Sequence, residues 1–196
     1  MSRSNRERTE TTRNALIEAA RALFVSKGYA DTATPEIVEA AGLTRGALYH
    51  HFEDKRALFE AVIAREAQAV AEAIEAGSPQ FGTAYEKLIS GAAAYFDAMA
   101  VPGRTRLLLL DGPAVLGLDE LGAIDRENAE GTLREGLSDY LSESGKPLDL
   151  LDPLTVLVSA AFDRAAIAIA AGGDRIDYER AIAALIDGIG ADQLRR

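Results

Sequence analysis

The stretch GLTRGALYHHFEDKRALF, residues 42–59, concentrates side chains that helix stability alone does not require. It carries adjacent histidines at positions 50 and 51, the only two of the chain, close to Arg45 and Tyr49. Gly46 stands where a helix is expected, although glycine inside a helix costs about 1 kcal/mol relative to alanine. The composition of this stretch therefore indicates a function as well as a fold.

Helix stop and start signals lie on both sides of the stretch. Gly28 is predicted to end a first helix, and Thr34 followed by Pro35 is predicted as the N-cap and first residue of a second. Gly42 ends that second helix after only one or two turns. The chain therefore enters residues 42–59 from a short helix braced by a longer one.

A third, brief helix is predicted to start at Thr44, with Leu48 and Phe52 four residues apart on its inward face. Asp54 is expected to cap a long fourth helix that stops at 77–79, a Gly-Ser-Pro sequence. Two short helices joined by a tight glycine-containing turn form a helix-turn-helix unit. In such a unit the N-terminal residues of the second helix contact base edges in the major groove of DNA.

Each polar residue of this third helix also has an ordinary explanation. Thr44 serves as an N-cap in any case, Arg45 is a common solvated side chain, and Gly46 also suits tight helix packing. The forked guanidinium of Arg45 nevertheless matches the O6/N7 edge of guanine, and a glycine allows close approach of a DNA backbone. The histidines do not form a metal site, because helical neighbours point about 100° apart and no further histidine or cysteine is present.

Charge is divided unevenly along this acidic chain of net charge −10. Residues 1–56 hold nine Lys/Arg against eight Asp/Glu, whereas the remaining 140 residues hold twelve against twenty-three. Such asymmetry is typical of a chain with two functions. The absence of cysteine excludes disulfides and thiol chemistry and is compatible with a reducing cytosol.

The pattern elsewhere is helical almost throughout, so an all-α fold is predicted. Residues 154–173 are apolar enough to resemble a membrane span, but Asp163 and Arg164 at their centre favour a buried helix of a soluble protein. No secretory signal is expected from the polar N-terminus. No catalytic motif is found, and the charged residues 119–135 are interpreted as a solvated helix face.

The stretch as a whole resembles the DNA-binding domain of the tetracycline-repressor (TetR) family of bacterial transcriptional regulators. The matching features are AA-x-x-LF at 19–24, KGY at 27–29, T-x-T-x-x-I at 32–37, AGL at 41–43 and GALYHHF-x-x-K-x-x-LF at 46–59. The resemblance covers roughly residues 10–63, about a third of the chain. Pro35 departs from the pattern, because it removes a backbone N–H that would otherwise be available to a phosphate.

The resemblance implies an N-terminal three-helix helix-turn-helix domain, residues 1–56, joined through a long helix at 55–76 to an effector-binding and dimerisation domain, residues 57–196. It implies DNA contacts by Thr34, Thr44, Arg45, Gly46, Ala47, Tyr49, His50 and Lys55. His51 is left open between phosphate contact and packing. It also implies a dimer interface built from the last two helices, expected near 154–171 and 178–190, with Ile167, Ile182, Leu185, Ile186 and Ile189 as candidates.

Residue choice in the second domain predicts a ligand cavity. Aromatic, aliphatic and acidic candidates for it are Tyr85, Phe96, Met99, Leu110, Asp111, Phe162 and Asp163. Each of them is also compatible with an ordinary core. Charges in apolar helices need partners, however, and an apolar pocket with a few convergent polar groups is the usual form of a small-molecule site.

The sequence therefore predicts a cytoplasmic, homodimeric repressor that binds a palindromic operator in double-stranded DNA and is released by a small hydrophobic or aromatic effector. No cofactor, metal or membrane partner is expected. Two alternatives remain: a DNA-binding architectural protein without an effector, and, less favoured, an enzyme on a helical scaffold.

Overall fold

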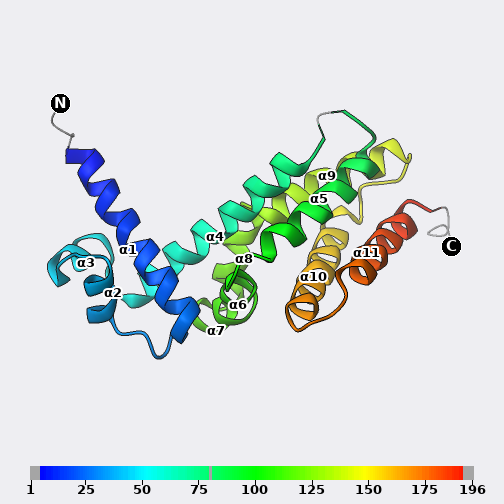
Figure 1. Ribbon diagram of the computed structural model, residues 1–196. Helices are drawn as coiled ribbons and strands as arrows, with labels where there is room; N and C mark the ends of the chain where they lie inside the picture. Colours follow the sequence, from blue (N-terminus) through cyan, green and yellow to red (C-terminus); the bar gives the residue numbers. More distant parts are fainter. Residues whose placement is uncertain (1–4, 80, 192–196) are drawn as a thin grey trace. The chain divides into compact units, whose positions relative to one another are not determined.

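The computed structural model describes residues 5–79 and 81–191, and every regular element in these ranges is helical, as predicted (Figure 1). The elements are α1 (Asn5–Lys27), α2 (Thr34–Ala40), α3 (Arg45–His51), α4 (Lys55–Gly77), α5 (Ala84–Met99), α6 (Arg104–Arg106), the π-helix η1 (Leu107–Asp111), α7 (Gly112–Leu116), α8 (Leu118–Arg126), α9 (Ala129–Glu143), α10 (Leu151–Ala170) and α11 (Arg175–Gly190).

These helices form two compact units. Unit 1 contains residues 1–66 and 102–121, and unit 2 contains residues 67–101 and 122–196. The helix α4 contributes its first half to unit 1 and its second half to unit 2. The boundary expected between residues 56 and 57 separates a DNA-binding domain from an effector-binding and dimerisation domain. These are functional domains rather than compact units, so that boundary stays a prediction.

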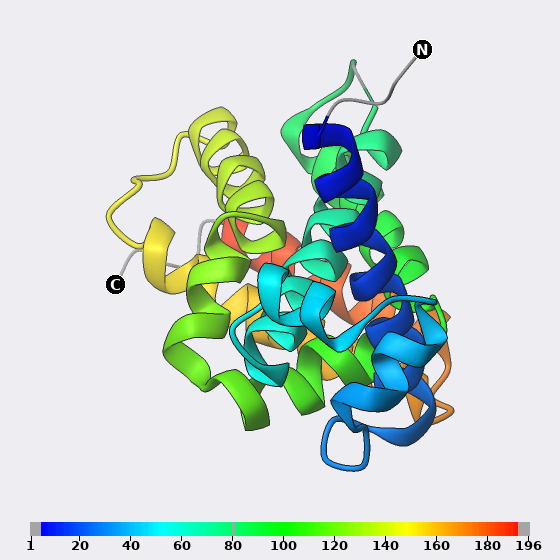
Figure 2. The same ribbon diagram turned by 90° about the vertical axis from the view of Figure 1, so that its left-hand side faces the viewer.

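In unit 1, the helices α2 and α3 pack against α1 and against each other, as Figure 2 shows. Their shared core includes the fully buried side chains of Leu16, Ile37 and Leu48. The ring of Phe59, from the first half of α4, lies 5.3 Å from that of Phe24 in an edge-to-face arrangement. A helix-turn-helix pair is thus held in place by a longer helix on each side.

The predicted helix ends are mostly confirmed. Gly28 and Gly42 both adopt positive φ, as expected of residues that follow a helix C-terminus. The backbone N–H of Ala57 donates to Oδ1 of Asp54 at 2.8 Å, which confirms the predicted cap of α4. The predicted N-cap at Thr34 is wrong by one residue. Ala33 is the N-cap, because Oε2 of Glu36 accepts its N–H at 3.0 Å.

Residues 102–121 join unit 1 through charged contacts. The buried carboxylate of Glu66, on α4, accepts hydrogen bonds from Nε of Arg21 at 2.8 Å and from Nε of Arg104 at 2.9 Å. Arg56 donates to Oε2 of Glu120 at 2.6 Å. The helices α1, α4 and α6 are therefore tied together by a single buried carboxylate.

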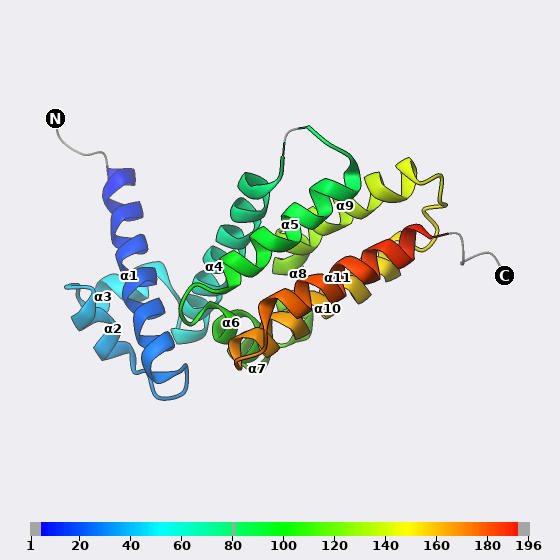
Figure 3. The same cartoon turned by 45° about the vertical axis from the view of Figure 1, so that its right-hand side comes forward.

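In unit 2, α5 and α9 pack closely, α10 packs on α9, and α11 lies beside α10 and α5 (Figure 3). The core contains Leu88, Phe96, Leu137, Val158 and Ile186, all buried. The rings of Tyr95 and Phe162 lie 5.3 Å apart, edge to face, and join α5 to α10.

The helix α10 is long and apolar enough to cross a membrane by length and composition only, which is weak evidence, since core helices of soluble proteins pass the same test. Only 28% of its most apolar window is buried within a single protomer. Val156 and Leu157 are exposed. One face of α10 is therefore apolar and uncovered in the protomer.

Candidate DNA-binding helix and ligand cavity

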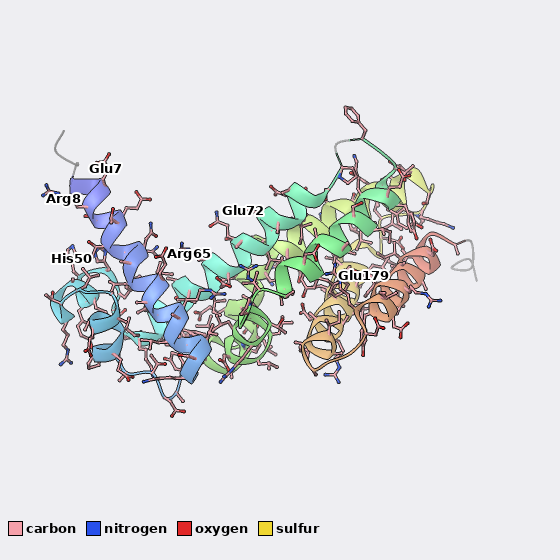
Figure 4. The ribbon with its side chains drawn as sticks, in the orientation of Figure 1. Glu7, Arg8, His50, Arg65, Glu72 and Glu179 are labelled. Carbon is pink, nitrogen blue, oxygen red and sulfur yellow. The ribbon has the colours of Figure 1, made fainter. Side chains whose placement is uncertain are left out.

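The helix α3 has a buried inner face and a polar outer face. Leu48 and Phe52 are buried, while Ala47 is half-buried. The outer face comprises Thr44, Arg45, Gly46, Tyr49 and His50, all exposed. Figure 4 shows His50 projecting from the outer side of α3. Thr44 is the N-cap, since its Oγ1 accepts the N–H of Ala47 at 3.2 Å, so its capping role is confirmed.

Three of the predicted DNA-contacting residues meet at Tyr49. The guanidinium carbon of Arg45 lies 5.5 Å from the centroid of the Tyr49 ring. Hydrogen bonds from the side chains of Thr34 and Arg45 lower the pKa of Tyr49. The start of α2 and the outer face of α3 are therefore joined through the hydroxyl of Tyr49.

Gly46 has no packing role within the protomer. A Cβ added at this position would meet only Oγ1 of Thr44, at 3.9 Å, which is ordinary contact. The tight-packing explanation for this glycine is therefore wrong. The predicted role of Gly46, close approach of a DNA backbone, stays a prediction.

Lys55 is held by the protein itself. Its Nζ donates to the carbonyl oxygens of Tyr29 at 2.8 Å and Thr32 at 3.0 Å, and lies 4.2 Å from the centroid of the Tyr29 ring. An ammonium group has three N–H donors, so a phosphate contact would use the third. His51 is half-buried beside Phe52, and burial is the main reason that its pKa is lowered. Packing is the better explanation for His51.

Unit 2 contains a partly open cavity of about 220 Å³ between the end of α4 and the helices α5, α8, α9 and α10. Ile74, Leu88, Ala92, Leu133 and Phe162 provide most of its apolar wall. The hydroxyl of Tyr95 donates to Oδ1 of Asp163 at 2.9 Å at one end. This cavity is mostly apolar with a few polar groups, as small-molecule sites usually are.

Two of the seven predicted ligand residues, Phe162 and Asp163, line this cavity. Phe96 and Met99 are buried in the core, and Tyr85 stacks near Tyr140 at 5.8 Å between ring centroids. None of these three is among the cavity-lining residues.

Leu110 and Asp111 do not line this cavity, because both residues belong to unit 1. Leu110 is exposed there, and Asp111 pairs with Arg106 at 3.2 Å. The charge that ends this apolar run therefore has an ion-pair partner in its own unit, the exposed side chain of Arg106.

Sequence reasoning missed Asp125, which lines the cavity from the end of α8. It lies within residues 119–135, which were interpreted as a solvated helix face. Burial raises the pKa of Asp125 to about 6, and the nearby Asp163 and Glu130 contribute. Helical spacing within residues 119–135 gave no signal for this, because α8 ends at Arg126 and α9 begins at Ala129, so Asp125 lies on a different helix from the lining residues of α9.

Two of the five predicted interface residues face the interior of the protomer. Ile182 and Ile186 are buried inside the protomer, and Ile186 has 0% of its surface exposed, so a partner cannot cover it further. Leu185 is 51% exposed, and Ile167 and Ile189 are half-buried. The apolar stripe on α11 is thus the inward face, and the outward face carries Leu185.

Comparison with known families matches both parts of the chain. Residues 16–62 match the family described as bacterial regulatory proteins, tetR family. Residues 85–189, more than half of the chain, match the tetracyclin repressor-like C-terminal domain.

Among curated proteins, the chain is 43% identical over 63 residues to the HTH-type transcriptional regulator TtgR of Pseudomonas putida, covering 32% of this chain and 30% of that protein. It is 27% identical over 138 residues to the transposon Tn10 TetC protein of Escherichia coli, covering 70% of each. The chain thus spans about three-tenths of the length of the first curated relatives that it matches.

A TetR-family transcriptional regulator from Pectobacterium atrosepticum has the same fold in a crystal structure. Its TM-score is 0.71 at 29% identity, with 95% of each chain covered. The helix-turn-helix of unit 1, the helical unit 2 and both family matches agree: the chain belongs to the TetR family and is a DNA-binding transcriptional regulator rather than an enzyme.

Proposed function

We propose that this regulator is a cytoplasmic repressor that binds a palindromic operator as a homodimer and leaves it when a small hydrophobic ligand occupies the cavity of unit 2. The observation that carries the proposal is the outer face of α3. This face is polar and exposed, and its Gly46 has no packing role. A helix of this kind suits the major groove of DNA.

Base reading is assigned to the N-terminal end of α3. Arg45 donates in fork geometry to a guanine edge, and Ala47 contacts a thymine methyl group. Thr34, Tyr49 and His50 contact phosphates, and Lys55 adds a further phosphate contact through its third donor. Thr44 lies at the same helix end, where its hydroxyl contacts a flanking phosphate.

Dimerisation is assigned to the uncovered faces of α10 and α11. Val156, Leu157 and Leu185 are exposed there, together with the small residues Ala181 and Ala184. Small residues allow close helix approach, and two copies of this face form a four-helix interface with two-fold symmetry. Two-fold symmetry is the reason that a palindromic operator is expected.

Repression is supported by a named relative, and ligand release is supported by the cavity of unit 2. BepR of Brucella suis is named a transcriptional repressor and is 43% identical over 65 residues, which cover 31% of its length. The cavity of unit 2 provides the space for a ligand. A ligand that shifts the dimer from 1:99 to 99:1 must favour the released state by about 5.5 kcal/mol.

The proposal is tested by selecting bound DNA from a random pool with the full-length chain. We expect enrichment of a palindrome whose half-sites are one helical turn apart, or a multiple of it. Thermal-shift screening of small lipophilic compounds should then give ligands that weaken binding to the selected DNA. Enrichment of no sequence, or ligands that stabilise the protein and leave operator affinity unchanged, would contradict the proposal.

A further inference from the structure

One end of the cavity in unit 2 is acidic. Asp163, on α10, and Asp125, at the end of α8, line it together, and both are partly buried. Asp163 accepts the hydroxyl of Tyr95, and Asp125 accepts the backbone N–H of Glu130. In the part of the chain that the structure describes, neither carboxylate forms an ion pair.

Glu66 shows how the same protein treats a buried carboxylate with a structural role. Burial by itself would raise the pKa of Glu66, but hydrogen bonds from Arg21 and Arg104 outweigh it and lower that pKa. Two guanidinium groups thus neutralise one carboxylate within unit 1. A partner of this kind is what a buried charge normally needs.

The cavity pair shows the opposite behaviour. Burial raises the pKa of Asp163, as it does that of Asp125, and the hydrogen bond from Tyr95 only partly offsets this effect. Asp125 and Asp163 also repel each other, and the charge of Glu130 adds to the repulsion. The charge of Arg126 lowers the pKa of Asp125 only in part, so burial and repulsion between the carboxylates outweigh it.

The other charged residues of the cavity wall are mostly acidic as well. Lys87 is the one cation among the described residues of the wall, and Glu135 and Asp139 line the wall as well. Lys87 and Tyr95 are eight positions apart on α5, which is about 12 Å along a helix. The lysine therefore lies toward the other end of the cavity, and four carboxylates face one ammonium group in the wall as a whole.

We propose that the ligand of this cavity is a small lipophilic cation, in which a protonated amine or quaternary ammonium group lies between Asp125 and Asp163 and an apolar part contacts the ring of Phe162. The inference rests on the proposed function and names the chemical class of its ligand. The partly open apolar space holds the apolar part of the ligand, and the two carboxylates favour a positive charge. A cation close to the rings of Tyr95 and Phe162 gains a further attraction from their faces.

The size of the cavity limits the ligand. About 220 Å³ is at or below the small end of the range of about 300–1,000 Å³ for small-molecule sites. A suitable probe is benzyltrimethylammonium, which carries one aromatic ring and one permanent charge. Its neutral isostere, neopentylbenzene, has a carbon atom in place of the nitrogen and therefore the same shape.

Equilibrium dialysis of the full-length chain against each compound at pH 7.5 measures the effect of charge directly. We expect benzyltrimethylammonium to bind at least tenfold more tightly than neopentylbenzene. D125N and D163N should each weaken binding of the cation about tenfold and change binding of neopentylbenzene less than twofold. D149N removes an exposed carboxylate of the same unit and serves as the matched control, with less than twofold change for either compound.

Equal binding of the two compounds by the wild type, or cation binding that both variants retain, would overturn the inference. Thermal melts establish that the variants are folded. Dialysis of the wild type at pH 5 and at pH 7.5 measures the contribution of the carboxylate charge to binding without any substitution. Protonation of Asp125 at pH 5 should weaken binding of the cation and leave that of neopentylbenzene unchanged. Release of selected operator DNA is measured separately, so a neutral ligand that releases DNA would leave the proposed function intact while refuting the cation.

Discussion

At Gly46, helix stability and DNA binding are expected to respond in opposite directions to the same substitution. A side chain at this exposed position would meet only ordinary contact within the protein. Glycine therefore lowers the helical stability of α3 with no compensation inside the protomer. Any benefit must come from outside the chain, and close approach to DNA is the benefit that its place on α3 suggests.

G46A is expected to raise the free energy of unfolding by about 0.5–1 kcal/mol, because alanine is the better helix former. The same change should weaken operator binding at least tenfold, because the new methyl group separates α3 from the DNA backbone. Urea unfolding and fluorescence anisotropy measure the two effects. An operator affinity equal to that of the wild type would assign Gly46 no role in binding.

Asp125 provides a second test at the scale of one residue. Its pKa of about 6 in the folded protein exceeds the ordinary value of 3.8, so the folded state retains a proton that the unfolded state has lost between these pH values. Stability therefore falls as the pH rises from about 4 to 6, and the full cost remains above pH 6. A shift of this size corresponds to about 2–3 kcal/mol.

D125N should therefore be more stable than the wild type by about 2–3 kcal/mol at pH 7.5 and nearly equal to it at pH 4. Chemical denaturation at the two pH values measures the difference. A variant that is less stable at pH 7.5 would show that the aspartate has a structural partner.

The helices α1, α4 and α6 depend on Glu66, whose pKa is lowered where that of Asp125 is raised. A lowered pKa contributes stability above the unfolded value and loses it as the pH falls through the folded value. Removal of one member of a buried ion pair leaves the others without compensation, at a cost of about 3–5 kcal/mol.

E66Q is accordingly expected to lower the free energy of unfolding at pH 7 by about 3 kcal/mol, with a smaller difference from the wild type in acid. The change in the free energy of unfolding caused by E66Q thus has the opposite sign to that caused by D125N under the same conditions. Denaturation curves in which E66Q and D125N change the free energy of unfolding in the same direction would contradict the opposite roles of the two carboxylates.

Local signals were sufficient to predict the first four helices. Gly28, Gly42, Thr44 and Asp54 each terminate or cap a helix through contacts within a few residues, and the structure confirms them. The cap at Ala33 was missed because alanine has no capping side chain. It depends instead on the carboxylate of Glu36, which bonds back to the Ala33 N–H.

The cavity and the interface were less predictable, because they depend on helices that are distant in sequence. Tyr95 and Asp163 are 68 residues apart and meet only through packing. Periodicity showed that Ile182 and Ile186 share one face of α11, but not whether that face lies against the same chain or against a partner. Their burial within the protomer resolves this question.

At the scale of the whole molecule, assembly should depend on Leu185 rather than on Ile186. L185E places a charge on the outward face of α11, so the protomer should remain folded while the dimer weakens by about tenfold or more in dissociation constant. Sedimentation at micromolar concentration measures the change. L148E alters another exposed leucine, in the segment between α9 and α10, and should leave assembly unchanged. Unchanged sedimentation of L185E would place the dimer interface elsewhere.

Sequence-specific DNA binding through α3 is the central claim, and fluorescence anisotropy on two duplexes tests it most directly. One duplex carries the selected operator and the other a scrambled sequence of the same composition. The wild type should prefer the operator by at least about 10³-fold. R45A should lose about 1–3 kcal/mol of this preference per half-site while its affinity for the scrambled duplex changes little, whereas H50A should weaken binding to both duplexes alike. A wild type without preference, or an R45A variant with the full preference, would contradict the account.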